Sequence, residues 1–170
     1  MNVRQSGLTL IEALIVIAVM AVLIYVALPG LGAFVDNQRV SSDTNDLFTS
    51  LLLARGEAVT RNSAVSLCKI DPDSPTDCAN TRPWQSGWIA FVDQDSDGDR
   101  DAGDTILETY TGMGSNTVVT AAGFANFVSY RPSGSTNTGG SYTVCVNSSV
   151  ARNIIINATG RPRIAETVCP

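Results

Sequence analysis

The stretch Gly7-Leu8-Thr9-Leu10-Ile11-Glu12 decides the fold, because it opens an apolar run that continues to Leu28. From Leu8 onward the run holds 21 residues, and a helix of that length is about 31 Å long, close to the thickness of a bilayer core. A carboxylate such as Glu12 is costly so near the start of a membrane-length helix, so it marks a functional residue. A secretory signal peptide is the alternative, but its cleavage site would follow the apolar run. The candidate site here, after Gly7, precedes the run, so the helix stays in the mature protein.

The same residues resemble the class III leader of type IV pilins and type II secretion pseudopilins. In that family a prepilin peptidase cuts after the glycine and methylates the new N-terminus, which implies processing between Gly7 and Leu8. The family's glutamate is the fifth residue after the cut and its proline the 22nd, and Glu12 and Pro29 fit both spacings. The family usually has phenylalanine where Leu8 stands. The resemblance also implies that Glu12 pairs with the N-terminal amine of a neighbouring subunit during assembly, because a buried carboxylate needs such a partner.

The composition is that of one globular domain joined to this helix. The chain has 170 residues, a net charge of −5 and no histidine, which excludes histidine-based acid–base catalysis and histidine metal sites. No other catalytic constellation is visible, so we expect a protein that is not an enzyme. We expect a leader (1–7), a transmembrane and filament-core helix (8–28), its amphipathic continuation (29–62) and a periplasmic or extracellular β-rich head (63–170).

Beyond residue 62 the sequence changes to short β-rich runs broken by Gly, Pro, Asn and Asp, a pattern typical of strands and turns. We therefore expect an α+β, type IV pilin-like fold, with a long N-terminal helix that is kinked at Pro29 and packs on an antiparallel head of two small sheets. The stretch between Arg131 and Ser141 is predicted to be a flexible hairpin tip. The predicted strands are residues 64–70, 88–92, 105–110, 117–121, 126–131, 141–146 and 153–157.

Four cysteines behind an export anchor indicate two disulfides in an oxidising periplasm. Four cysteines allow three pairings. We favour Cys68–Cys78, which closes a short loop, and Cys145–Cys169, which ties down the C-terminal segment. A zinc site is less favoured, because no two cysteines have C-x-x-C spacing.

An acidic loop follows the run Trp88-Ile-Ala-Phe-Val-Asp93, and this order of strand, acidic loop and strand resembles the FimT/GspH-like branch of minor pilins. The loop also matches positions 1, 3, 5, 6, 9 and 12 of the twelve-residue calcium-binding pattern, although its last position is aspartate where the pattern has glutamate. The alternative is a solvated turn whose aspartates accept hydrogen bonds from nearby backbone N–H groups. The candidate calcium ligands are Asp93, Asp95, Asp97, Asp101 and Asp104, with Gly98 at position 6.

The segment Gly160-Arg161-Pro162-Arg163 resembles the GRxR motif of FimT-type minor pilins that bind DNA during natural transformation. Two arginines two apart in an extended segment project to the same side, and guanidinium groups suit phosphate oxygens. Residues 71–108 carry ten acidic and two basic residues, net −8, so the remainder of the chain is net +3. The alternative is that the arginines pair with carboxylates such as Glu166 or with a neighbouring subunit. The candidate DNA-binding residues are Gly160, Arg161, Arg163 and Arg152, and Arg131 could add to them.

These features predict a minor type IV pilin that binds extracellular double-stranded DNA for uptake in natural transformation. We expect an inner-membrane protein with one span and a periplasmic head, which later joins a cell-surface pilus. Its expected partners are other minor and major pilins, the prepilin peptidase and DNA. We expect no cofactor other than the candidate calcium ion. The alternatives are a structural tip or priming subunit without DNA binding and a GspH-like pseudopilin of a type II secretion system.

Overall fold

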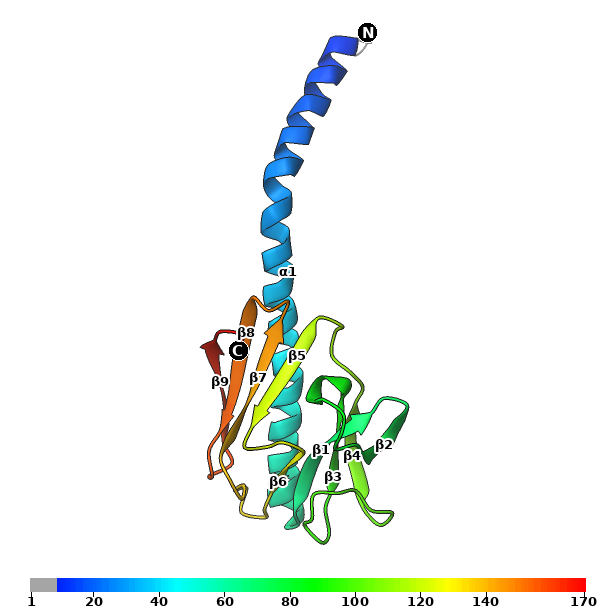
Figure 1. The fold of residues 1–170 in the computed structure, drawn as a ribbon, viewed down its shortest axis with the longest axis vertical. Coiled ribbons are helices and arrows are strands. Elements are labelled where there is room, and N and C mark those ends of the chain that lie inside the picture. The colour runs from blue at the N-terminus through cyan, green and yellow to red at the C-terminus, as the bar shows by residue number, and fades with distance from the viewer. Residues whose placement is uncertain (1–8) are drawn as a thin grey trace, which may run out of the picture. The chain divides into compact units, whose positions relative to one another are not determined.

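The computed structural model describes residues 9–170, apart from the side chains of residues 26–30. Gly7 and Leu8, the predicted processing site, lie outside the described residues. The chain divides into two compact units, Met1–Asp36 and Asn37–Pro170. One helix, α1 (Leu10–Arg61), contributes to both of them (Figure 1).

Thr9 precedes the first residue of α1 and caps the helix in the first unit. Its hydroxyl oxygen accepts a hydrogen bond from the N–H of Glu12 (3.3 Å), and its carbonyl accepts one from the N–H of Ala13 (3.2 Å). Threonine at this position satisfies an N–H group that has no partner within the first helical turn. Glu12 is exposed in that turn, where a negative charge suits the positive end of the helix dipole.

The first unit exposes large apolar side chains along α1, beginning at Leu10. Within the described part of the chain, no helical segment is both long and apolar enough to cross a membrane. The predicted span, residues 8–28, includes residues 8 and 26–28, which lie outside that description, and the span stays a prediction. The helix assignment continues through Pro29 without a break. The kink expected there also stays a prediction, because the side chain of Pro29 is not described.

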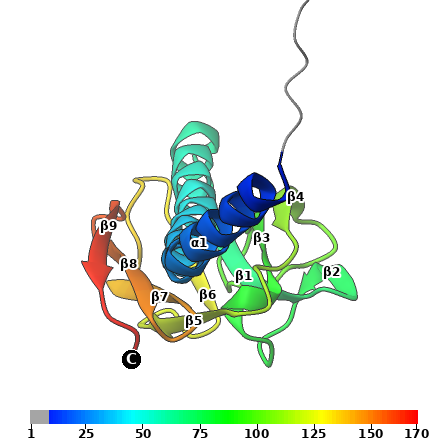
Figure 2. The same cartoon turned by 90° about the horizontal axis from the view of Figure 1, so that it is seen from above.

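The second unit, the head, contains two antiparallel sheets beside the second half of α1 (Figures 1 and 2). One sheet has the order β2 (Ser74–Cys78), β1 (Val65–Asp71), β3 (Trp88–Val92), β4 (Thr105–Tyr110), and β6 (Phe127–Tyr130) also pairs with β1. The other has the order β5 (Thr117–Ala122), β7 (Gly140–Val146), β8 (Val150–Ile156), β9 (Pro162–Thr167). A short 3-10 helix, Trp84–Ser86, precedes β3. This architecture confirms the predicted α+β fold with two small sheets.

The head has one main core, which α1 shares with both sheets. A helical stripe that includes Leu47, Leu51 and Ala58 is fully buried against aromatic residues of the two sheets, among them Trp88 and Tyr142. Because these positions recur every three or four residues, they line one face of the helix. The sheets are therefore fixed relative to each other through the helix, and so are the loops that they carry.

Polar contacts reinforce this packing. The Tyr110 hydroxyl of the five-stranded sheet donates to Asp46 of α1 (3.0 Å), and the Thr117 hydroxyl of the four-stranded sheet donates to Asp43 (2.5 Å). Burial raises the pKa of Tyr110, and its bond to Asp46 raises it further. The hydroxyl therefore stays a donor at physiological pH.

Both predicted disulfides are confirmed. Cys68–Cys78 joins β1 to β2, and Cys145–Cys169 fastens the segment after β9 to β7. The second bridge closes a loop that contains all of β8 and β9, so it restrains the strand in which the GRxR motif ends.

Two parts of the sequence prediction are wrong. Nine strands are assigned in the described residues instead of seven, and the two additions are β2 and β9. The stretch after Arg131 is not a flexible hairpin tip, because it connects the two sheets and is anchored through buried Gly134 and Thr136. The carbonyl of Gly134 accepts a hydrogen bond from Nε of Arg55 in α1 (2.9 Å).

Candidate functional site

The GRxR segment begins in the tight turn that joins β8 to β9. The N–H of Gly160 donates to the carbonyl of Asn157 (2.8 Å), and Gly160 has a φ of +76°. Side chains other than glycine rarely adopt this left-handed conformation. A methyl group at Gly160 would also overlap the carbonyl oxygen of Gly134 and lie 3.1 Å from the Cα of Ser135. The glycine of the motif is therefore required by the backbone, and it sets the direction in which Arg161 leaves the turn.

Arg161 and Arg163 lie on the solvent-facing side of β9. Successive strand residues alternate between faces, and Ile164 packs on the core. Arg163 therefore points away from the core, and Arg161, the residue just before β9, is exposed as well. No ion pair of either arginine is present among the residues that the structure describes. The alternative prediction of a pair with Glu166 is not supported, because Glu166 lies on the opposite face of the strand.

Arg152 is not brought together with these two arginines. It lies opposite Glu166 in the register of β8 and β9, and the next pair on the same face, Ile154 and Ile164, packs into the core. Arg152 therefore occupies the helix-facing side of the sheet and is half-buried. Of the candidate DNA-binding residues, Gly160, Arg161 and Arg163 form one site, and Arg152 is separate from it.

The outer face of the four-stranded sheet is free of carboxylate side chains. The only acidic residue in the four strands is Glu166, on the inner face. Strand alternation and register assign to the outer face small or neutral side chains around Arg163. They are Val118, Thr120, Ala122, Ser141, Thr143, Cys145, Ala151, Asn153, Ile155, Ala165 and Thr167. In a protein of net charge −5, the strand side chains of this face include no carboxylate that would repel an anion.

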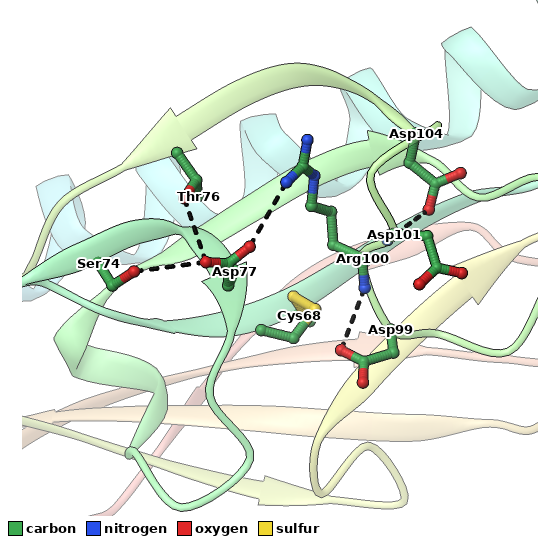
Figure 3. A network of polar contacts seen from close by, with 9 residues as sticks. Cys68, Ser74, Thr76, Asp77, Asp99, Arg100, Asp101 and Asp104 are labelled. Atoms are coloured by element: carbon green, nitrogen blue, oxygen red, sulfur yellow. Dashed lines mark hydrogen bonds and ion pairs between the residues drawn. A yellow bond between two sulfur atoms is a disulfide. The ribbon is translucent and has the colours of Figure 1, made fainter.

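The acidic loop belongs to the other sheet, where it joins β3 to β4. Viewed from above, β9 and β4 lie on opposite sides of the helix (Figure 2). Arg100 of the loop extends its side chain to Asp77 in β2 (3.4 Å; Figure 3). Most of the negative charge is thus separated from the arginine segment by the body of the head.

Asp93 anchors the acidic loop from inside the protein. It is fully buried, and its carboxylate accepts hydrogen bonds from the Ser66 hydroxyl (2.6 Å) and from the N–H groups of Ser96 (2.7 Å) and Gly98 (3.0 Å). Burial raises the pKa of Asp93, and these three donors oppose that rise. The bonding is that of an aspartate-stabilised turn, which was the alternative to the calcium interpretation.

The structure brings together only three of the five candidate calcium ligands. Carboxylate oxygens of Asp93, Asp95 and Asp97 lie within 4.8 Å of one another. The Asp104 carboxylate instead accepts from the N–H groups of Gln94 (3.3 Å) and Asp101 (3.0 Å). The neighbouring charge of Asp95 is the largest cause of a raised pKa at Asp101. Calcium takes six to eight oxygen ligands, and the three grouped carboxylates supply only part of such a shell.

A calcium titration separates the two interpretations of this loop. A bound ion would stabilise the folded state by RT ln(1 + [L]/Kd), about 2.7 kcal/mol at a hundredfold excess over Kd. Groups of the protein already donate hydrogen bonds to the carboxylates of Asp93 and Asp104. We therefore expect the same melting temperature in chelator and in millimolar calcium. A reproducible rise with calcium, abolished by Asp95→Asn, would show instead that the loop is an ion site.

Comparison with known proteins decides the family. The model described as "Type II transport protein GspH" matches residues 43–160, and the model described as "Prokaryotic N-terminal methylation motif" matches residues 2–28. The first match covers more than half of the chain. The chain belongs to the GspH family. Together with the methylation motif, this membership places it among the minor type IV pilins and pseudopilins.

Solved structures agree with the GspH fold. The minor type IV pilin FimU of Pseudomonas aeruginosa aligns with a TM-score of 0.62 and 20% identity, over 81% of this chain and 99% of that one. The minor pseudopilin EpsH of Vibrio cholerae aligns with a TM-score of 0.53 and 11% identity, over 75% of this chain and 97% of that one. At such identities the likeness shows the fold alone. A sequence comparison with curated proteins found no match.

Two residues near the arginine segment were not among the predicted site residues. Gly134 makes the close backbone approach to Gly160, and Arg55 of α1 binds the Gly134 carbonyl. The composition of the stretch after Arg131 indicated only a turn, and Arg55 fitted a solvated helix face. Nothing local in the sequence connects either residue to position 160.

Proposed function

We propose that this protein is a minor type IV pilin that binds extracellular double-stranded DNA through Arg161 and Arg163, for uptake in natural transformation. The supporting observation is the pair of exposed arginines on one side of β9, beside a sheet face without carboxylates. Guanidinium groups form charge-assisted hydrogen bonds with phosphate oxygens, and such contacts carry no sequence information. The protein would therefore hold any duplex.

The N-terminal part supplies the filament. We propose that processing after Gly7 makes Leu8 the methylated N-terminus, as the methylation-motif match supports. Before assembly the helix anchors the protein in the inner membrane. Afterwards Glu12 pairs with the terminal amine of a neighbouring subunit. The positive amine compensates the negative charge of Glu12, which would otherwise be buried in the filament without a partner. The head then displays β9 on the cell surface.

Two alternatives share the same fold. A structural tip or priming subunit would bind only other pilins. A type II secretion pseudopilin would act in a secretion system, as the description of the family model suggests. Both account for the helix and for Glu12. In a structural subunit the two exposed arginines would pair with a neighbouring subunit. We favour DNA binding because two guanidinium groups beside a strand face without carboxylate side chains suit the repeated phosphates of a duplex.

Replacing both Arg161 and Arg163 by Gln tests this function in cells. We expect normal amounts of the protein in pili, because α1 and the core are unchanged, and transformation reduced by at least an order of magnitude, because the phosphate contacts are lost. Arg152→Gln is the control, since it removes one arginine charge from the other face, and it should transform normally. Full transformation by the double variant favours the structural alternative, and loss of secretion with no effect on uptake favours the pseudopilin.

A further inference from the structure

Another exposed arginine, Arg131, lies in the turn that follows β6. The N–H of Arg131 donates to the carbonyl of Ser135 (2.8 Å), and the N–H of Gly134 donates to the carbonyl of Arg131 (2.8 Å). These two backbone bonds close the turn, and the Arg131 side chain remains exposed. The turn, residues 131–135, is therefore rigid in its main chain and free to present a charge.

This turn is fastened directly to the arginine segment. The carbonyl of Gly134 lies so close to the Cα of Gly160 that no β-carbon would fit between them. The nearby Thr136 adds a bond to the β8–β9 connection, from its N–H to the carbonyl of Ala158 (3.2 Å). Its hydroxyl donates mainly to the carbonyl of Thr138 (2.8 Å) and also lies 3.3 Å from the carbonyl of Asn157. The backbones that carry Arg131 and Arg161 are therefore held at one junction, although the residues are 30 positions apart in the sequence.

The helix supports the same junction. Nε of Arg55 donates to the Gly134 carbonyl (2.9 Å), the group that Gly160 also approaches. Arg55 is only half-exposed, so part of its side chain is committed to this contact. The bond from Arg55 to the Gly134 carbonyl therefore suits a residue that positions the turn better than a residue that contacts a ligand.

The charge around the junction is of one sign. Residues 131–136 and 157–163 contain three arginines and no acidic residue. On the helix, the Glu57 carboxylate is already paired with Arg61. A polyanion at the junction would meet guanidinium groups from two loops without a competing free carboxylate in either.

We propose that the phosphate-binding surface consists of Arg131, Arg161 and Arg163, and that Arg55 is a positioning residue that holds the turn carrying Arg131. This inference rests on the proposed DNA binding and extends its footprint from one strand to two segments. The ligand is the sugar–phosphate backbone of duplex DNA. Arg152 is excluded from the surface, because it faces the other side of the sheet.

The salt dependence of binding tests the footprint. The full chain in a non-ionic detergent is titrated into a labelled duplex of arbitrary sequence, and anisotropy is recorded across a salt series. Each phosphate contact contributes about −0.9 to the slope of log K against log salt, so three contacts give about −2.7. A rise from 50 to 200 mM salt then weakens the parent about 40-fold and Arg131→Gln about 12-fold. Arg131→Lys, which keeps the charge, should retain most of the parental slope.

The role of Arg55 is tested by a double-mutant cycle. If Arg55 acts through the turn, Arg55→Gln weakens binding in the parent and has no further effect in the Arg131→Gln background. Equal effects in both backgrounds would overturn the positioning role. Melting curves of each variant confirm that the head is folded.

The outcomes separate this inference from the proposed function. A lower slope for Arg131→Gln, with the parental slope for Arg152→Gln, supports the three-arginine surface. A parental slope for Arg131→Gln, when the Arg161→Gln/Arg163→Gln variant has a lower one, overturns the inference and leaves the proposed function intact. A parental slope for that double variant overturns the proposed function itself. A loss of slope in Arg152→Gln equal to that of Arg131→Gln overturns the assignment of the surface to one face.

Discussion

Gly160→Ala is expected to destabilise the head and to weaken DNA binding together. At a φ of +76° a side chain costs about 1–3 kcal/mol, and the methyl group would also press on the Gly134 carbonyl, which is backbone and is held by Arg55. Relief requires the β8–β9 turn and the Arg131 turn to move apart. At roughly 4 °C per kcal/mol for a domain of this size, the melting temperature should fall by about 4–12 °C.

Gly56→Ala is the matched control for this substitution. Gly56 lies inside α1, and a β-carbon there would meet nothing within 4 Å. The same chemical change should therefore raise the stability of the head by about 0.5–1 kcal/mol, through helix propensity. A Gly160→Ala variant that melts like the parent and binds DNA like the parent would show that the junction tolerates separation and that the motif glycine has no structural role.

Asp93→Ala is expected to have the second large effect. The substitution leaves the Ser66 hydroxyl and the N–H groups of Ser96 and Gly98 without their acceptor in the protein interior. A buried donor without a partner costs about 1–3 kcal/mol, and partial access of water to the loop reduces the sum, so we expect a loss of about 2–4 kcal/mol. Urea or thermal unfolding of the full chain in detergent measures it.

Two further variants bracket the Asp93 result. Asp93→Asn keeps one carbonyl oxygen as an acceptor and should cost less than Asp93→Ala. Asp95→Ala removes an exposed aspartate of the same loop and should change stability by less than about 0.5 kcal/mol. Equal losses for Asp93→Ala and Asp95→Ala would mean that the loop is stabilised by its total charge and not by the buried carboxylate.

Local sequence information predicted the elements whose signal is local. Residue periodicity within short windows indicates the helical stripe around Leu47 and Leu51 and most strands. The leader motif is a short run of consecutive residues. Of the three possible disulfide pairings, we favoured Cys68–Cys78 because it closes a short loop and Cys145–Cys169 because it ties down the C-terminal segment, and the structure has both bridges.

The two missed strands have weak local signals. β2 reads Ser-Pro-Thr-Asp-Cys, a composition typical of a turn, and its pairing with β1 is supported by the Cys68–Cys78 bridge. β9 begins with Pro162, which disfavours a central strand but is tolerated at the start of an edge strand. Whether such a segment pairs depends on the partner strand, and that information is not local.

The candidate site was predictable in its residue types but not in its geometry. The spacing of Arg161 and Arg163 places them on one side of any extended segment, and the structure agrees. The face of the sheet on which Arg152 lies depends on the register between β8 and β9, because a shift of one residue would move its side chain to the other face. The junction of Gly134 with Gly160 joins residues distant in the sequence, so no sequence window contains it.

DNA affinity as a function of salt, measured for the parent and for the Arg161→Gln/Arg163→Gln variant, tests the central claim most directly. The claim predicts that the variant loses about 1.8 in the slope of log K against log salt, and that it does so equally on duplexes of unrelated sequence. Its melting temperature should stay close to that of the parent, because both side chains are exposed. Identical slopes and affinities for the two proteins would contradict DNA binding by the arginine segment.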